Sequence, residues 1–324
     1  MEYADSLGFL DLQGKLPKIN PDIALSLIHC TAAPPPPWGP TDKVGIVKAA
    51  REFGNVLESQ GAVIVKTLSD LWKPGLKVIL GLQSPVFPSS EKELSETIGH
   101  LRKIGGILIS GIAYKDENPY GGGFLFPDTF LDCSAFSFLH SLSQEGMILD
   151  LSHAGHKTAE LCLALLQEES FSLPVIATHG GCYEIYRNHR NLPDFILKEI
   201  ACRGGLVGVY TLTFGLHEND NGLMPFLAHL THALDVCGED AVCVGTDGVY
   251  QTIDRELSKT QFAQMKDKLD PEGRMGVRFP DQPVELNTPK KMEVLYDFIA
   301  KWHGERIAEK VCGKNFFSFL SRVL

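Results

Sequence analysis

Short apolar runs alternate along the chain with stretches in which apolar residues recur every three or four positions. The first pattern is typical of buried strands and the second of amphipathic helices, such as those predicted at 91–104 and 156–169. Eight runs are predicted to be strands: Phe9–Gln13, Ile23–Cys30, Val78–Gln83, Ile107–Ala113, Met147–Ser152, Pro174–Thr178, Leu206–Tyr210 and Val242–Thr246. Strands that are apolar throughout and separated by helices indicate a parallel sheet covered by helices.

The number of strand–helix units favours a closed (β/α)₈ barrel, because eight such units complete a TIM barrel. A chain of 324 residues suits one domain of this class with extended loops. We therefore predict a single TIM-barrel domain over residues 1–324, with no internal repeat and no interdomain linker. A doubly wound open sheet is the alternative.

Three segments are expected to lie outside the regular elements. Residues 34–40 contain a run of prolines that cannot be helical, and residues 116–128 combine a proline with three consecutive glycines after the fourth strand. Residues 250–287 are charged and contain prolines, which indicates either a poorly packed excursion or a lid.

Charge and composition exclude several classes of partner. The formal net charge of -10, without any basic run interleaved with aromatics, excludes nucleic acid. The first ten residues lack the features of a signal peptide, and the most apolar stretch, 104–114, is too short to span a bilayer. We expect a soluble cytoplasmic protein without a membrane partner, whose eight cysteines, none in a C-x-x-C pair, are mostly buried free thiols.

Polar side chains follow most of the predicted strands. In a barrel of this type the carboxyl ends of the strands converge around the mouth, where active sites lie. Side chains at these ends can ligate a metal, transfer a proton or donate a hydrogen bond, and we expect them to share one cavity: Gln13, His29, Gln83, Tyr114, His153, His179 and Asp247.

Two histidines follow consecutive strands and predict a metal site, because neighbouring imidazoles are common ligands of zinc. These are His153 and His179, and a buried pair held by backbone carbonyls is the alternative. Asp247 is placed for proton transfer or ligation, unless it only shapes a strand-end turn. Arg190 could bind a substrate carboxylate through two parallel N–H donors, with a surface ion pair as its alternative.

These motifs together resemble the membrane (renal-type) dipeptidases of the amidohydrolase superfamily, over roughly residues 60–324. The motifs that carry the resemblance are GMILDLSH at 146–153, PVIATHGG at 174–181, RNLPD at 190–194, VGTDG at 244–248 and VCGKNF at 311–316. Upstream, GLQSP at 81–85 stands in the place of the family's Gly-x-Glu-Gly. Tyr114 and Asn118 occupy its Thr-His-x-x-x-Asn segment, where Tyr114 replaces a substrate-binding histidine.

The resemblance implies a barrel with two zinc ions that share a bridging hydroxide, which attacks the peptide bond of a dipeptide. His153 and His179 would be ligands of the second zinc. Arg190 would hold the substrate's terminal carboxylate, and Asp247 would carry the proton to the leaving amine. The resemblance also implies a homodimer.

Departures from the family concern the first zinc. Where the family's first strand supplies His-x-Asp, the comparable place here offers Gln13 and Lys15, and the bridging glutamate is replaced by the neutral Gln83. We expect the first metal to be absent, with Lys15 supplying a positive charge in its place, so that the protein holds one zinc ion or none. A single catalytic zinc would need Asp247 or His29 as a third ligand. Tyr114 would then donate a hydrogen bond to the oxyanion of the transition state.

The sequence leaves three functions open. The favoured one is a metal-dependent hydrolase, with at most one metal, acting on a dipeptide or a similar small carboxylate-bearing amide. The second is a catalytically inactive relative that serves as a binding or structural protein. The third is a metal-free hydrolase with a Cys or Ser nucleophile, for which Cys30 beside His29 is the candidate, although adjacent residues after a strand point apart.

Overall fold

The computed structural model describes residues 2–11, 17–34, 39–40, 42–84, 91–169 and 172–324. Its main sheet is a ring of parallel strands, as predicted, and neighbouring strands pair in the order of the following list. They are β1 (Ala4–Asp5), β2 (Leu27–Thr31), β4 (Lys77–Leu82), β5 (Ile107–Gly111), β8 (Ile148–Asp150), β9 (Val175–Gly180), β10 (Leu206–Val209) and β11 (Val242–Val244). Backbone hydrogen bonds from Ser6 N to Val244 O (3.0 Å) and from Asp247 N to Leu7 O (2.9 Å) join the first strand to the last. The (β/α)₈ barrel is therefore confirmed.

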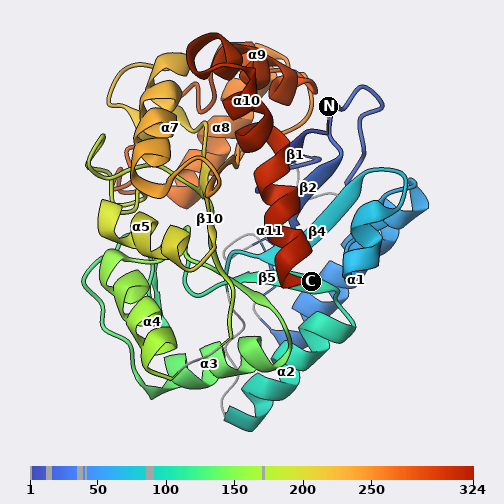
Figure 1. Cartoon of the computed structure of the whole chain (residues 1–324), viewed down its shortest axis with the longest axis vertical. Coiled ribbons are helices and arrows are strands. Elements are labelled where there is room, and N and C mark those ends of the chain that lie inside the picture. The colour runs from blue at the N-terminus through green and yellow to red at the C-terminus, as the bar shows by residue number, and fades with distance from the viewer. Residues whose placement is uncertain (1, 12–16, 35–38, 41, 85–90, 170–171) are drawn as a thin grey trace.

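Most of the helices surround this ring on its outer face, while α11 lies across one end of it (Figure 1). The helices are α1 (Lys43–Ser59), α2 (Glu91–Lys103), α3 (Cys133–Gln144), α4 (His156–Glu168), α5 (Asp194–Cys202), α6 (Thr213–Leu216), α7 (Leu223–Cys237), α8 (Arg255–Leu269), α9 (Lys291–His303), α10 (Glu305–Glu309) and α11 (Asn315–Val323). Shorter elements are β3 (Val63–Ile64), the β6–β7 hairpin (Glu117–Asn118 and Gly121–Gly122), the 3₁₀ helices η1 (Leu68–Trp72) and η2 (Val284–Leu286), and the π-helix η3 (Lys310–Lys314). Within the described residues, every helix is too short or too polar to cross a lipid bilayer.

The interior of the ring is filled by one apolar layer and closed at one end by α11. Each strand of the ring contributes a buried residue to this layer: Ala4, Leu27, Ile79, Ile109, Ile148, Ile176, Leu206 and Cys243. Phe316, Phe319 and Leu320 of α11 pack against the same layer, and Figure 1 shows that helix lying across the strands. Because most of the strand residues lie near the amino ends of their strands, α11 closes the end of the barrel opposite the mouth.

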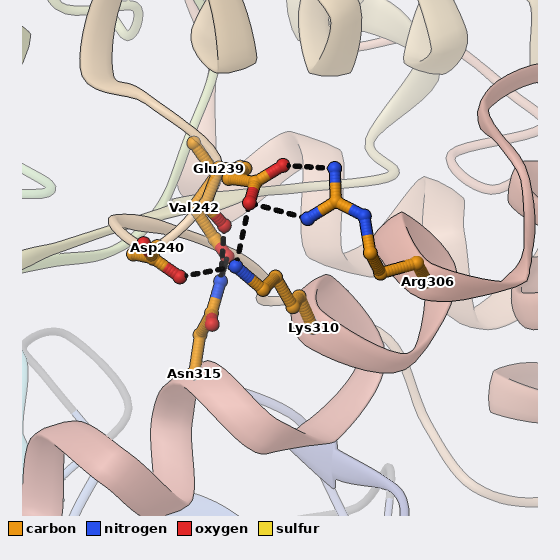
Figure 2. A network of polar contacts seen from close by, with 6 residues as sticks. All are labelled: Glu239, Asp240, Val242, Arg306, Lys310 and Asn315. Atoms are coloured by element: carbon orange, nitrogen blue, oxygen red, sulfur yellow. Dashed lines mark hydrogen bonds and ion pairs between the residues drawn. The ribbon is translucent and has the colours of Figure 1, made fainter.

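Polar contacts fix the start of α11 to the loop before β11 (Figure 2). The side-chain amide of Asn315 donates to the backbone oxygens of Glu239 and Val242, both at 2.7 Å. Lys310 and Arg306 form ion pairs with the carboxylate of Glu239. The asparagine of the VCGKNF motif therefore has a structural role.

The predicted position of the first strand was wrong. We expected it at Phe9–Gln13, whereas the strand that pairs with β2 is Ala4–Asp5, and the parallel contact with the last strand continues to Phe9. The strand escaped notice because it ends in a buried carboxylate, Asp5, and therefore does not read as an apolar run. The other predicted strands lie at their expected places within a few residues.

Two of the expected loops contain regular structure. The glycine-rich segment at 116–128 includes the β6–β7 hairpin. The segment at 250–287 includes α8, which begins after Asp254, whose side chain accepts hydrogen bonds from the first helical N–H groups. Phe262, Leu269 and Val277 of this segment pack with Phe214, so the segment is not a poorly packed excursion.

Candidate functional site

The barrel brings the two predicted histidines together at its mouth. His153 follows β8 and His179 lies near the carboxyl end of β9, and the two strands pair in parallel. Their Nε2 atoms are 3.0 Å apart, and both side chains are buried. The site therefore contains a pair of imidazoles in direct contact.

A buried carboxylate below the pair determines which way the ring of His179 faces. Asp150 accepts hydrogen bonds from the hydroxyls of Thr178 (2.6 Å) and Ser152 (2.5 Å) and from the N–H groups of the same two residues. Since the hydroxyl hydrogen of Thr178 is used on Asp150, the 2.7 Å contact between Thr178 Oγ1 and His179 Nδ1 must be an N–H donation from the ring. Nε2 of His179 therefore presents a lone pair to His153.

Both imidazoles are held in their neutral form. Burial lowers the pKa of His153 and of His179 well below the ordinary histidine value, and the nearby guanidinium of Arg190 lowers both further. Two neutral rings with converging nitrogens are what a metal ion requires of its histidine ligands.

The guanidinium of Arg190 lies against this pair and not on the surface. Its Nη1 donates to Ser152 O, while Nη2 donates to His179 O (3.2 Å) and contacts His153 Nε2 at 3.3 Å. Its central carbon lies 5.8 Å from the ring centre of Phe124 and 5.5 Å from that of Tyr210. Two of the five N–H donors of this arginine are thus used on backbone oxygens, which leaves others for a ligand.

A cavity of about 50 Å³ opens beside the pair. Ten residues line it: Tyr114, Phe124, His153, Asn188, Arg190, Leu212, Phe214, Asp247, Leu269 and Met275. The last two belong to the segment at 250–287, which therefore covers the mouth in the position of a lid. As it stands the cavity has room for a few water molecules, so a larger ligand requires this segment to move.

Asp247 lies in the turn that follows β11, and its side chain lines the cavity. Its backbone has a φ of 52°, in the left-handed region that few residues other than glycine adopt and that is often found at functional sites. Burial raises the pKa of its carboxyl to about 6, although Arg190 acts in the opposite direction. A carboxyl with this pKa can gain or lose a proton near neutral pH.

Tyr114 lines the cavity as predicted, but Asn118 does not. The ring of Tyr114 packs on that of His153, with centres 4.3 Å apart. The side chain of Asn118 instead holds its own loop, because it donates to Ile112 O (2.8 Å) and accepts from the N–H of Tyr120 (2.7 Å). A substrate-binding role for Asn118 has no support in this arrangement.

The residues that stand in place of the first metal's ligands either lie outside the cavity or fall outside the described residues. Gln83 is buried directly after β4 but does not line the cavity, and Gln13 and Lys15 lie outside the described residues. The corrected first strand is followed by residues 6–9, which include no histidine. Asp5 at its end already accepts hydrogen bonds from the hydroxyls of Thr246 and Tyr250, both at 2.6 Å.

His29 lies inside the barrel and does not complete a ligand set with the pair. Its Nδ1 donates to Ser6 O (2.8 Å), and its Nε2 is buried without a hydrogen-bond partner among the described residues. Across the residues that the structure describes, the three potential ligand atoms that lie within 4.8 Å of one another belong to Glu184, Asp194 and His232. This group is partly exposed and outside the cavity, so it offers a surface position for a cation and not a catalytic one.

The donors at the mouth do not fit a catalytic zinc ion. Two imidazole nitrogens on one tetrahedral zinc lie roughly 3.3 Å apart, close to the spacing found for His153 and His179. However, a catalytic zinc has three protein ligands, and neither Asp247 nor His29 joins the pair within ligand distance. The guanidinium of Arg190 also brings a positive charge to within 3.3 Å of one of the two nitrogens.

Several residues of the site were not predicted. Asp150 and Ser152 could have been found, because both stand in the LDLSH motif that identified His153. Phe124, Leu269 and Met275 carry no signal of this kind, since their approach to the cavity depends on long loops whose paths the apolar pattern does not specify.

Solved structures share the fold of this chain. An amidohydrolase from Pseudomonas aeruginosa superimposes with a TM-score of 0.75 at 20% sequence identity, covering 99% of this chain and 96% of its own. A metallopeptidase from Rhodobacter sphaeroides, bound to a phosphinate mimic of the dipeptide L-Ala-D-Ala, gives a TM-score of 0.73 at 17% identity, covering 100% and 99%. These likenesses show that the chain shares the barrel fold of these proteins.

Sequence comparison finds similarity to one family of dipeptidases. A family model for membrane dipeptidases, peptidase family M19, matches residues 136–261, which include both histidines, Arg190 and Asp247. A dipeptidase of Schizosaccharomyces pombe is 26% identical over 152 residues, or 44% of this chain and 35% of that protein. The dipeptidase verJ of Clonostachys rogersoniana is 29% identical over 137 residues, or 41% and 31%.

The resemblance to the membrane dipeptidases that the motifs indicated is confirmed, and the matched segment carries it. The family is one of metal-dependent dipeptidases and hydrolases. The matched segment spans about a third of the length of the two curated relatives.

Proposed function

We propose that the barrel mouth binds a small ligand of the dipeptide class without hydrolysing it by metal-activated water. The observation that carries the proposal is the incomplete set of metal ligands at the histidine pair, within the part of the chain that the structure describes. The two imidazoles lack a third ligand among the described residues, so they offer half of a catalytic site.

The charges around the cavity match a zwitterionic ligand. Arg190 retains N–H donors for a carboxylate, and Asp247 on the same cavity offers a carboxylate to an ammonium group. A free dipeptide carries both of these groups. Tyr114 adds a phenol beside them, and burial keeps that phenol protonated by raising its pKa, so it can donate to the ligand's amide oxygen.

The protein should therefore bind dipeptides without turnover. We expect calorimetry to detect binding of a panel of free dipeptides, and elemental analysis of protein purified without chelators to find no stoichiometric metal. Hydrolysis should stay at the background rate when Zn²⁺, Co²⁺ or Mn²⁺ is added. Turnover that depends on one added ion and disappears in His179→Ala would overturn the proposal.

Asp247→Asn gives a separate test of how the ligand is held. Because the variant loses the carboxylate but keeps the side-chain size, the Kd of a free dipeptide should rise about tenfold, the equivalent of one charge-assisted hydrogen bond. The matched control is the N-acetylated form of the same dipeptide, which has no ammonium group, so its Kd should be the same for wild type and variant. An equal loss of affinity for both ligands would mean that Asp247 does not contact the amine.

A hydrolase with a single metal ion is the second candidate function. Two observations favour it: the lone pair on Nε2 of His179 and the raised pKa of Asp247, about 6, which suits a proton carrier. The turnover assay above separates the two candidates. A homodimer and a cytoplasmic location, which the sequence indicated, stay predictions.

A further inference from the structure

We propose that the segment above the barrel mouth, residues 269–277, makes the site selective for ligands with an apolar side chain. We call these residues the cover. The inference rests on the proposed function, because it takes the ligand to be a free dipeptide held by Arg190 and Asp247. These two residues contact only the ligand's termini, whereas the cover decides which side chains the ligand can have.

The two groups that would hold the ligand's termini lie on either side of one strand. Arg190 is in the loop after β9 and Asp247 in the turn after β11, and β10 pairs with both of these strands. The residues after β10 that line the cavity are Leu212 and Phe214. A dipeptide that extends from the arginine to the aspartate would therefore pass these two apolar side chains.

The cover adds two more apolar side chains to the same cavity. Leu269 at the end of α8 and Met275 in the turn after it both line the cavity. A buried carboxylate fixes this turn, since Asp270 accepts hydrogen bonds from the N–H groups of Met275 (2.9 Å) and Val277 (3.2 Å). The backbone of Met275 therefore has a defined position above the mouth.

The cover and the loop after β10 share an apolar cluster that borders the cavity. Its buried members are Phe214, Phe262, Leu269 and Val277, and Leu212 and Met275 pack against them. Because the cavity measures about 50 Å³, the cover has to lift for a dipeptide to enter and then close over it.

Closure favours an apolar ligand side chain, because such a side chain would join the cluster when the cover returns. A polar side chain would lose its water there instead. The four side chains on this side of the cavity, Leu212, Phe214, Leu269 and Met275, have no hydrogen-bond donor and no strong acceptor to replace that water, so binding would be weaker.

The test compares ligands that have the same termini and nearly the same shape. Calorimetry gives the Kd of Ala-Val against Ala-Thr and of Val-Ala against Thr-Ala, where threonine has a hydroxyl in place of one methyl of valine. We expect the wild type to bind the valine peptide at least about tenfold more tightly than the threonine peptide in one or both orders, because the hydroxyl is buried without a partner.

Three variants assign this preference to the cover. Met275→Gln should reduce it to about threefold or less, because the amide can form a hydrogen bond with the threonine hydroxyl. Met275→Leu keeps the side chain apolar and should retain the wild-type preference. Met265→Gln is the matched control and should also retain it, because Met265 packs against the same cluster but does not line the cavity. Both methionines are partly exposed, so a polar replacement should not prevent folding.

Equal affinity for the valine and threonine peptides in both orders would overturn the inference and leave the proposed function standing. The same holds if Met275→Gln keeps the wild-type preference. Metal-dependent hydrolysis by the wild type would instead end the proposed function, and the ratio of kcat/KM for the paired peptides would then test the inference in the same variants. Failure of every dipeptide to bind would overturn both.

Discussion

Replacing Asp150 with alanine is expected to lower the free energy of unfolding by about 4 kcal/mol, because it leaves two buried N–H groups without acceptors at a cost of roughly 2 kcal/mol each. These are the N–H groups of Ser152 and Thr178, each 3.0 Å from the Asp150 carboxylate, which is itself buried. The two hydroxyls that donate to Asp150 would also lose their acceptor, although they can rotate toward others. Urea denaturation followed by circular dichroism measures the change.

Asp150→Asn is the matched control for this substitution. Its amide oxygen can still accept from both N–H groups, so the loss should be only about 1 kcal/mol. Its amide nitrogen, in the place of Oδ2, would donate to the hydroxyl of Thr178 and turn that hydroxyl's hydrogen toward His179 Nδ1. Nitrogen NMR of the imidazoles should then show the hydrogen of His179 on Nε2 in place of Nδ1.

Equal stability losses for the two variants would contradict this account, since they would mean that the N–H acceptors do not matter. An unchanged tautomer of His179 in Asp150→Asn would contradict the orientation assigned to the Thr178 hydroxyl. The two readouts are independent, because one measures the whole fold and the other a single ring.

The meeting of His153 and His179 could be predicted from sequence because it follows from topology. Parallel strands that are neighbours in a barrel end at the same edge, so polar residues directly after them must converge. The same rule placed Asp247 and Tyr114 at the cavity. The rule works when the polar residue lies within three positions of the end of a strand that is clearly apolar.

The direction of Arg190 could not be predicted, because no strand or helix contains it. Its loop is held by side-chain contacts of the neighbouring asparagine: Asn191 donates to Tyr186 O (2.9 Å) and Gly215 O (2.8 Å) and accepts from the hydroxyl of Tyr210 (2.7 Å). Contacts between residues far apart in sequence thus turn Arg190 inward. A periodic pattern of apolar residues contains no information of this kind.

The prediction of the first strand was wrong for a different reason, because a buried carboxylate interrupts the apolar run of that strand. Asp5 is tolerated there because four donors from the strand ends satisfy it, among them the N–H of Leu7 and the N–H and hydroxyl of Thr246. The apolar pattern alone gives the next run, Phe9–Gln13, the stronger strand signal. Because the first strand was placed several residues too late, its end was compared with the family's first-zinc ligands at the wrong positions. Neither the predicted nor the observed strand is followed by His-x-Asp.

Replacing Phe319 with alanine should also cost about 4 kcal/mol of unfolding free energy, the usual value for a large aromatic ring removed from a core. Phe319 is buried in the layer that fills the barrel, together with Phe316 and Leu320. Phe317→Ala is the matched control, because that ring is only partly buried on the same helix, and roughly 1 kcal/mol is expected there. Urea denaturation of both variants measures the difference. If the two variants lost equal stability, the burial of Phe319 in the barrel layer would not be what makes α11 stabilise the fold.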